Sequence, residues 1–341
     1  DEPYFDETGY ARMAARHFNT EHTVFSLTND DLYHHVRSLL DYIDEPFADS
    51  SAIAVYILSK ETRKHATVAL SGDGADELLA GYHKHKAVYR MLHPGIMEKS
   101  ISSLGGLWGA MPHSRNHPLF NAFRQLDRFA KAMKLDAKER YWYLAGFAHE
   151  QESRQLFSKT VLPQLEQQEF LNRKNEILKT MGLGTINEML LTDTKWVLPN
   201  DMLAKVDLMS MAHGLEVRSP FLDYELVDFI FSLPEGFKIN STMGKRIAQD
   251  AFKEMLPAKL YNRPKKGFEV PLLKWFRKEM KSMITDDLLS RELIEGQNIF
   301  DYREVSKLKK QLFSSNPGDA HARVWGLVVF QWWWKKFAIG Q

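Results

Sequence analysis

The stretch Val68-Ala69-Leu70-Ser71-Gly72-Asp73-Gly74-Ala75-Asp76-Glu77 is a short apolar run that ends in a glycine-rich turn and the start of a helix. We call residues 71–77 the acidic loop. A turn of this kind directs backbone N–H groups toward whatever lies beyond the strand, which suits a phosphate. The loop's carboxylates would repel a phosphate, so a nucleotide site here requires Mg²⁺ between them. The alternative is that Asp73 and Asp76 only cap the helix, and spacing alone leaves both interpretations open.

The first third of the chain alternates between helical and extended patterns. Helices are expected over residues 6–18, with a cap at Asp6, over 29–43, with a cap at Asn29, and over 52–64; strands are expected over 21–26 and 66–70. This alternation is typical of a doubly wound parallel sheet, in which ligands bind at the carboxyl ends of the strands. The acidic loop lies at such an end.

From Ala75 onward the pattern is almost entirely helical, with breaks expected at prolines such as Pro199. We therefore predict an α/β chain that is predominantly helical, with a two-strand remnant of a parallel sheet and a large helical body. No second independent domain is expected, so residues 1–341 are assigned to one domain.

Length and composition limit the classes of protein to which this chain can belong. A chain of 341 residues, 44% of them hydrophobic, is long enough to bury a proper core. Its net charge of +1 supplies no basic field for nucleic acid. The absence of cysteine excludes disulfides and thiolate metal sites and fits a reducing compartment, so we expect a cytoplasmic location. The longest apolar run, Val324 to Trp334, is about half the ~20 residues that span a bilayer, so it predicts a buried terminal helix and no membrane segment.

Three further motifs accompany the acidic loop. Asp44-Glu45-Pro46-Phe47-Ala48-Asp49-Ser50-Ser51 precedes it, a long motif from Lys205 to Asp223 follows it, and Arg263-Pro264-Lys265-Lys266-Gly267-Phe268 comes last. The four motifs in this order resemble the synthetase domain of glutamine-dependent asparagine synthetases. The resemblance implies an adenine-nucleotide-hydrolase-like (ATP pyrophosphatase) fold.

Two features of that family do not occur in these residues. The family's Ser-Gly-Gly-x-Asp-Ser loop, which holds the ATP pyrophosphate, is missing, and so is the N-terminal cysteine nucleophile of its glutaminase half. The chain also starts at Asp1. We expect a truncated synthetase domain from a longer enzyme, without its pyrophosphate loop and its glutaminase domain. We expect this piece alone to lack synthetase activity.

The resemblance implies roles for residues of the acidic loop. Asp76 matches a metal ligand that holds Mg²⁺ through pyrophosphate, and Ser71 and Gly72 match positions that lie against ATP. Asp73 matches the acid near the attacking ammonia, where a carboxylate base is typically worth ~10²- to 10⁴-fold in rate. Many relatives carry Glu at this position, and related β-lactam synthetases carry Tyr.

Two lysines are candidates for phosphate contact. Lys265 follows Arg263-Pro264 as the family's catalytic lysine does, and the adjacent Lys266 could act in its place because lysine is a point charge on a flexible stem. Lys245, at a helix start, is a second candidate for binding ATP, with an ordinary surface lysine as the equal alternative.

The remaining candidates lie outside the acidic loop. Glu45, Asp49, Ser50 and Ser51 match a stretch that helps to hold the acceptor amino acid, although for Asp49 and Ser50 helix capping explains the pattern as well. Glu216 and Arg218 are expected to form a buried ion pair rather than to act in catalysis. The pairs His34-His35 and His83-x-His85 point apart on a helix, so they are interpreted as solvated or core histidines rather than metal ligands.

The function that the resemblance implies is ATP-dependent amide formation. The side-chain carboxylate of aspartate would be adenylated, and glutamine-derived ammonia would then give asparagine, AMP and pyrophosphate. The implied cofactors are ATP and Mg²⁺, and the ammonia would come from the missing glutaminase domain. No nucleic-acid or membrane partner is expected, and a homodimer stays open. Two alternatives remain: a sister amidotransferase acting on another carboxylate, such as a natural product or a surface sugar, and a non-catalytic accessory module.

Overall fold

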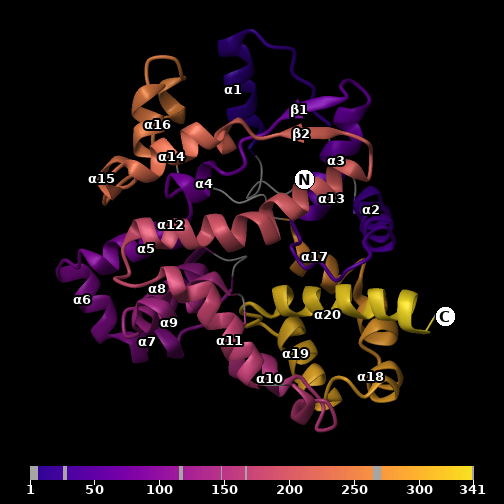
Figure 1. Cartoon of the computed structure of the whole chain (residues 1–341). Helices are drawn as coiled ribbons and strands as arrows, with labels where there is room; N and C mark the ends of the chain where they lie inside the picture. The colour runs from indigo at the N-terminus through magenta and orange to yellow at the C-terminus, as the bar shows by residue number, and fades with distance from the viewer. Residues whose placement is uncertain are drawn as a thin grey trace. The chain divides into compact units, whose positions relative to one another are not determined.

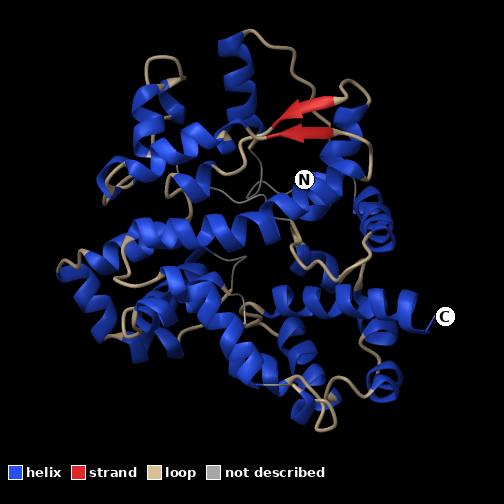
Figure 2. Ribbon diagram, viewed as in Figure 1, coloured by secondary structure: helices blue, strands red, loops and turns tan. Residues whose placement is uncertain are grey.

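The computed structural model describes residues 7–25, 29–114, 118–146, 148–165, 167–263 and 270–339. The chain divides into two compact units, each assembled from three segments. The first unit consists of Asp1–Val36, Ser51–His93 and Thr180–Val270, and the second of Arg37–Ser50, Pro94–Lys179 and Pro271–Gln341. Helices dominate both units, and one pair of strands lies side by side in the first (Figure 2).

Figure 1 labels the α-helices and both strands along the chain. The elements of the first unit are α1 (Thr8–Phe18), α3 (Ala52–Arg63), β1 (Val68–Leu70), α4 (Ala75–Leu78), α5 (His83–Leu92), α12 (Ile186–Thr192), η3 (Asp193–Leu203), α13 (Ala204–Met211), β2 (Glu216–Arg218), η4 (Pro220–Leu222), α14 (Tyr224–Ser232), α15 (Glu235–Lys238), α16 (Arg246–Ala251) and η5 (Ala258–Leu260). Those of the second unit are α6 (Ile96–Ser103), α7 (Gly105–Ala110), α8 (Pro118–Ala132), α9 (Ala137–Ala145), α10 (Glu150–Gln155), η1 (Leu162–Gln164), α11 (Gln167–Ile177), α17 (Leu272–Arg277), η6 (Met283–Leu288), α18 (Arg291–Gln297), α19 (Tyr302–Phe313), α20 (Ala320–Trp334) and η7 (Lys335–Ile339). Two elements, α2 (Asn29–Tyr42) and η2 (Leu178–Thr180), run from one unit into the other.

The sheet consists of β1 and β2 in parallel, with Val68 opposite Glu216 and Leu70 opposite Arg218. The predicted strand over 66–70 is thus confirmed over its last three residues, and the predicted two-strand parallel sheet exists. Its second strand is not the predicted one. The strand expected over 21–26 is wrong over 21–25, which is exposed loop, because extended residues without a pairing partner or a buried face do not form a strand.

The N-terminal helices largely follow the sequence patterns. α1 ends at Phe18 as predicted but begins after Glu7, and Asp6 lies outside the described residues. α2 begins at Asn29 as predicted, ends one residue early at Tyr42, and buries Val36, Leu39 and Leu40; Ile43, the next residue, is buried as well. α3 ends one residue before the predicted Lys64. Apolar spacing predicted these helices well because helical periodicity depends only on residues close together in the sequence.

The break expected at Pro199 does not occur. Helix continues from α12 through the π-helical segment η3 into α13, and Pro199 lies inside η3. Proline has no N–H and its ring clashes with the carbonyl of the preceding turn of an α-helix. The wider turn of a π-helix provides the space that the ring needs, so the helix passes through the proline.

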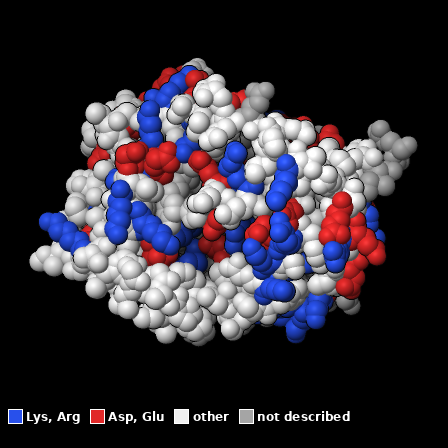
Figure 3. Space-filling model, turned by 90° about the horizontal axis from the view of Figure 1, so that it is seen from below, with Lys and Arg blue, Asp and Glu red and all other residues white. Residues whose placement is uncertain are grey.

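The core of the second unit includes α20, where Val324, Trp325, Leu327 and Val328 are buried. The run from Val324 to Trp334 is thus part of a buried helix as predicted. Trp332 donates its indole N–H to Asp41 Oδ1 at 2.9 Å, and Trp333 donates to the carbonyl of Asp44 at 2.6 Å. Among the described residues, no helix is both long and apolar enough to cross a membrane. On the face shown in Figure 3, basic and acidic side chains are interspersed.

Candidate active site

The acidic loop begins where β1 ends. The backbone N–H of Ser71 donates to the carbonyl of Arg218 at 2.8 Å, which extends the parallel pairing by one step. The hydroxyl oxygens of Ser71 and Ser219 are 3.0 Å apart. The loops that follow the two strands therefore meet at one edge of the sheet, where parallel sheets bind their ligands.

Two glycines shape the turn of the loop. Gly74 has φ +86°, and a Cβ there would lie 2.3 Å from Leu222 Cδ2, so only glycine fits. Gly72 is exposed and faces open space. Gly74 is also the N-cap of α4, a helix of a single turn, so neither Asp73 nor Asp76 is the cap residue. Leu78 and Leu79 anchor the far end of the loop in a core formed with Ile230 of α14.

The three carboxylates of the loop have different surroundings. Asp73 is half-buried and accepts a hydrogen bond from the hydroxyl of Ser71 at 2.7 Å. Asp76 forms an ion pair with Lys245, with 2.9 Å between Oδ1 and Nζ. Glu77 is buried and accepts from the Tyr82 hydroxyl at 2.5 Å. Burial raises the pKa of Glu77, and the Tyr82 hydrogen bond offsets this only in part. Environments this different favour different chemical roles for the three acids.

Lys245 reaches the loop from the start of α16. It is the N-cap of that helix, has φ +52°, and donates its backbone N–H to the carbonyl of Leu79 at 2.7 Å. Two glycines allow this close approach, because a Cβ on Gly81 would lie 1.9 Å from Asp76 Oδ1 and one on Gly244 would lie 2.3 Å from the carbonyl oxygen of Ala80. The predicted phosphate-contact lysine and the predicted metal ligand are therefore neighbours.

Gly81→Ala is expected to separate Asp76 from Lys245, because the new methyl group would overlap both side chains. Overpacking of this kind typically costs ~1–3 kcal/mol in free energy of unfolding, measurable by chemical denaturation. Gly236→Ala is the matched control, since no atom lies within 4 Å of a Cβ built there. Equal effects of the two substitutions would contradict the steric role of Gly81.

A second polar cluster, which sequence reasoning missed, lies in the first unit at the start of η3. Asp193 is fully buried, with Oδ1 2.7 Å from Lys84 Nζ and Oδ2 2.7 Å from His85 Nε2. His85 is thus a core histidine, as predicted, and it accepts at Nδ1 from the backbone N–H of Tyr82 at 3.3 Å. The sequence signal for Asp193 is an acid close to the apolar run Met189-Leu190-Leu191.

The protonation states in this cluster follow from burial and hydrogen bonding. Burial alone would raise the pKa of Asp193, but the charge of Lys84 and the bond from His85 prevail and lower that pKa to about 2. Burial lowers the pKa of His85 despite the neighbouring carboxylate. Because Nδ1 accepts from Tyr82, the neutral ring carries its proton on Nε2 and donates it to Asp193.

The stability of the first unit is expected to fall as the pH drops below about 6.5. The unfolded chain takes up a proton on His85 near its ordinary pKa of 6.5, whereas the folded state does so only at lower pH. Each pH unit in that window removes up to ~1.4 kcal/mol. His85→Gln should flatten the pH dependence of unfolding, and His83→Gln, on an exposed neighbour, should not. Identical slopes for both variants and the wild type would contradict a buried neutral His85.

The four residues predicted to hold the acceptor belong to different units. Ser51 accepts from Nζ of the buried Lys205 at 2.9 Å in the first unit. Glu45, Asp49 and Ser50 belong to the second unit. Lys265 and Lys266 lie outside the described residues.

Two strand residues correct a prediction. Arg218 Nε and Glu216 Oε1 are paired at 2.8 Å as predicted, but their side chains are 64% and 57% exposed, so the expected burial of the pair is wrong. Both residues lie on the exposed face of a strand whose middle residue, Val217, is half-buried. Alternation along the strand places them together on that face.

The described residues contain no cluster of three or more His, Cys, Asp or Glu side chains that could hold a metal. A Mg²⁺ ion at Asp76 would therefore take its other ligands from water and, when a nucleotide is bound, from phosphate oxygens, which is common for this ion. The carboxylate chemistry of Asp76 fits such a role.

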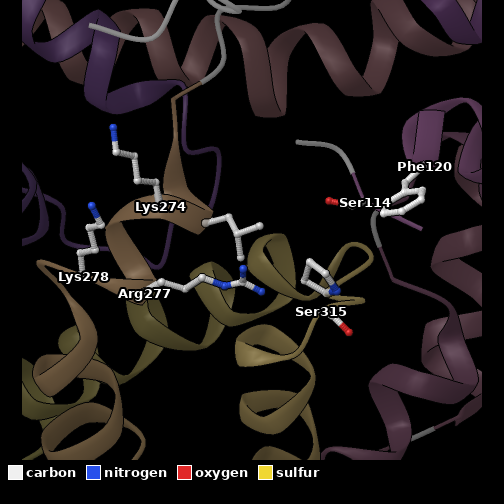
Figure 4. A pocket seen from close by; sticks show the side chains of 8 residues that line it. Ser114, Phe120, Lys274, Arg277, Lys278 and Ser315 are labelled. Atoms are coloured by element: carbon white, nitrogen blue, oxygen red, sulfur yellow. The ribbon is translucent and has the colours of Figure 1, made fainter. Parts of the chain in front are cut away.

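A cavity of about 360 Å³ lies in the second unit. It is lined by Ser114, Phe120, Leu273, Lys274, Arg277, Lys278, Ser315 and Pro317. Figure 4 shows Arg277 extending toward the segment around Ser315, while Lys274 and Lys278 point elsewhere. The Arg277 guanidinium donates to the carbonyls of Leu312 and Ser314, so its bonding ties α17 to the end of α19.

Comparison with known proteins gives the family. A family model described as asparagine synthase matches residues 1–335. The chain belongs to the asparagine synthase family. Asparagine synthetase (glutamine-hydrolyzing) 1 of Bacillus subtilis is 26% identical over 335 residues, which cover 96% of this chain and 50% of that protein. A putative asparagine synthetase (glutamine-hydrolyzing) of Mycobacterium bovis is 27% identical over 332 residues, covering 96% and 48%.

A shorter match is to a putative asparagine synthetase (glutamine-hydrolyzing) of Methanocaldococcus jannaschii, 38% identical over 87 residues. The chain spans about half the length of the first two relatives. The predicted resemblance to the asparagine synthase family is confirmed.

Proposed function

We propose that this asparagine synthase chain is the synthetase part of an amide-forming ligase. The side-chain carboxylate of aspartate is activated with ATP, and glutamine-derived ammonia displaces AMP to give asparagine, with pyrophosphate as the other product. The observation that carries the proposal is the placement of Asp76 and Lys245 together beside Asp73 in the loop at the carboxyl end of β1. The loop and Lys245 together combine a candidate metal ligand, a candidate phosphate-binding cation and a candidate base.

Activation of the carboxylate comes first, because a free carboxylate is a poor electrophile. Asp76 would hold Mg²⁺, which when bound neutralises charge on the pyrophosphate that leaves. Ser71 and the exposed backbone of Gly72 would lie against ATP, and Lys245 would contact its phosphates. Lys265, on the strength of the family motif, would be the second cation.

The ammonia step assigns a base role to Asp73. The Ser71 hydroxyl donates a hydrogen bond to the Asp73 carboxylate. In the contact between the two serine hydroxyls, Ser219 is therefore the donor and Ser71 the acceptor. This chain of hydrogen bonds orients the Asp73 carboxylate as an acceptor. A carboxylate oriented in this way is suited to take the proton that the attacking ammonia must lose.

Further parts of the proposal rest on the family alone. Glu45, Asp49, Ser50 and Ser51 would hold the acceptor amino acid. Both compact units would form one synthetase domain over residues 1–341, with an ATP pyrophosphatase-like fold. A homodimer and a cytoplasmic location stay predictions.

The decisive experiment uses a full-length protein that carries this chain together with the remaining half that its relatives have. ATP–pyrophosphate exchange is measured with aspartate and with other carboxylates, and asparagine and AMP are scored when ammonia or glutamine is added. Exchange that depends on aspartate supports the proposal. Exchange with another carboxylate alone would favour a sister amidotransferase, and no exchange with any would favour a non-catalytic module. Residues 1–341 alone are expected to form no asparagine.

A further inference from the structure

Lys245 and Asp76 form an ion pair at the centre of the proposed site. Nζ lies 2.9 Å from Oδ1, and the two side chains are 30% and 15% exposed. The lysine ammonium therefore contacts one of the two carboxylate oxygens to which the proposed function assigns a divalent cation.

The backbone holds the lysine in this place. Lys245 has a left-handed conformation and its N–H is bonded to Leu79, one residue before the turn that carries Ala80 at φ +58° and Gly81. Gly81 and Gly244 remove the Cβ atoms that would keep the two segments apart. The two chain segments thus place the lysine side chain beside Asp76.

We propose that Lys245 and a divalent metal ion compete for Asp76, so that metal binding releases the lysine ammonium to the phosphates of the nucleotide. This inference rests on the proposed function. A hard cation binds a carboxylate oxygen at about 2.0–2.1 Å, and a second positive charge on that oxygen is repelled. A partly exposed ion pair contributes little net stability, so the exchange is easy. Lys245 would then reach the phosphates only once the metal is bound.

The test measures Mn²⁺ binding to the full-length protein by electron paramagnetic resonance of the free ion, without nucleotide. Lys245→Met should tighten binding about threefold to tenfold, because the competing charge is removed while the side chain keeps its length. Asp76→Asn should abolish binding at this site. Lys64→Met is the matched control, since Lys64 pairs with Glu61 at 2.6 Å on an exposed surface before the start of β1, and it should leave Mn²⁺ affinity unchanged.

A second measurement follows Lys245 itself through its acetylation by a lysine reagent, read by mass spectrometry. Mn²⁺ should raise the labelling of Lys245 several-fold in the wild type. In Asp76→Asn the labelling should be high with or without the metal. Both results would support the exchange even if Lys245→Met folded poorly.

The outcomes separate this inference from the proposed function. If Asp76→Asn abolishes Mn²⁺ binding but Lys245→Met leaves it unchanged or weakens it, the competition is overturned and the metal assignment stands. If the extent of Lys245 labelling in the wild type is the same with and without Mn²⁺, the competition is likewise overturned. If the wild type binds no Mn²⁺ that depends on Asp76, the metal assignment falls and the inference falls with it.

Discussion

Asp73→Asn in the full-length protein is expected to lower asparagine formation by ~10²- to 10⁴-fold while ATP–pyrophosphate exchange stays near the wild-type rate. The amide has nearly the shape of the carboxylate and still accepts the Ser71 hydrogen bond, but it cannot take a proton as a base. The loss should therefore fall on the ammonia step alone. The measurement compares exchange with asparagine formation in the same preparation.

Asp76→Asn supplies the contrast for that prediction. Removing the charge that faces Lys245 and would hold Mg²⁺ should depress exchange and raise the Mg²⁺ concentration needed. The two substitutions should thus give different profiles. If both half-reactions were lost together in both variants, the division of the loop into a base and a metal ligand would be wrong, and the carboxylates would act jointly on the metal.

Asp193→Ala is expected to cost about 3–5 kcal/mol in free energy of unfolding. The substitution removes the carboxylate that neutralises Lys84 and accepts from His85, both at 2.7 Å, in a place where Asp193 has no exposure to solvent. Breaking a buried pair from one side leaves the remaining charge without compensation. Chemical denaturation of the chain at pH 7 measures the effect.

Glu61→Ala is the control for Asp193→Ala. Glu61 pairs with Lys64 one turn along an exposed helix surface, where such pairs are worth at most about 0.5 kcal/mol. Asp193→Asn should fall between the two, because the amide keeps an acceptor for His85 but loses the charge. A loss for Asp193→Ala no larger than that for Glu61→Ala would show that the buried cluster does not stabilise the first unit.

Local patterns were reliable where a single segment holds all the information. The apolar spacing of α2 and the turn residues after β1 were correct because helix periodicity and glycine conformations depend on neighbours in sequence. The strand predicted over 21–26 was wrong over 21–25, because a strand forms only with a pairing partner and the residue pattern of one segment does not supply that partner. The helix break predicted at Pro199 was wrong because a rare π-helical turn accommodates a residue that ordinarily ends a helix.

The sequence by itself determined the asparagine synthase family, the helical character of the chain and the identity of the acidic loop, since these depend on motifs and on periodicity. Only the tertiary structure decided that β1 pairs with Glu216–Arg218, that Lys245 lies on Asp76, and that Asp193 joins Lys84 and His85 in the core. Each of these contacts joins residues more than a hundred positions apart. Their partners are chosen by packing and burial across the whole fold, which the spacing of residues along one segment does not encode.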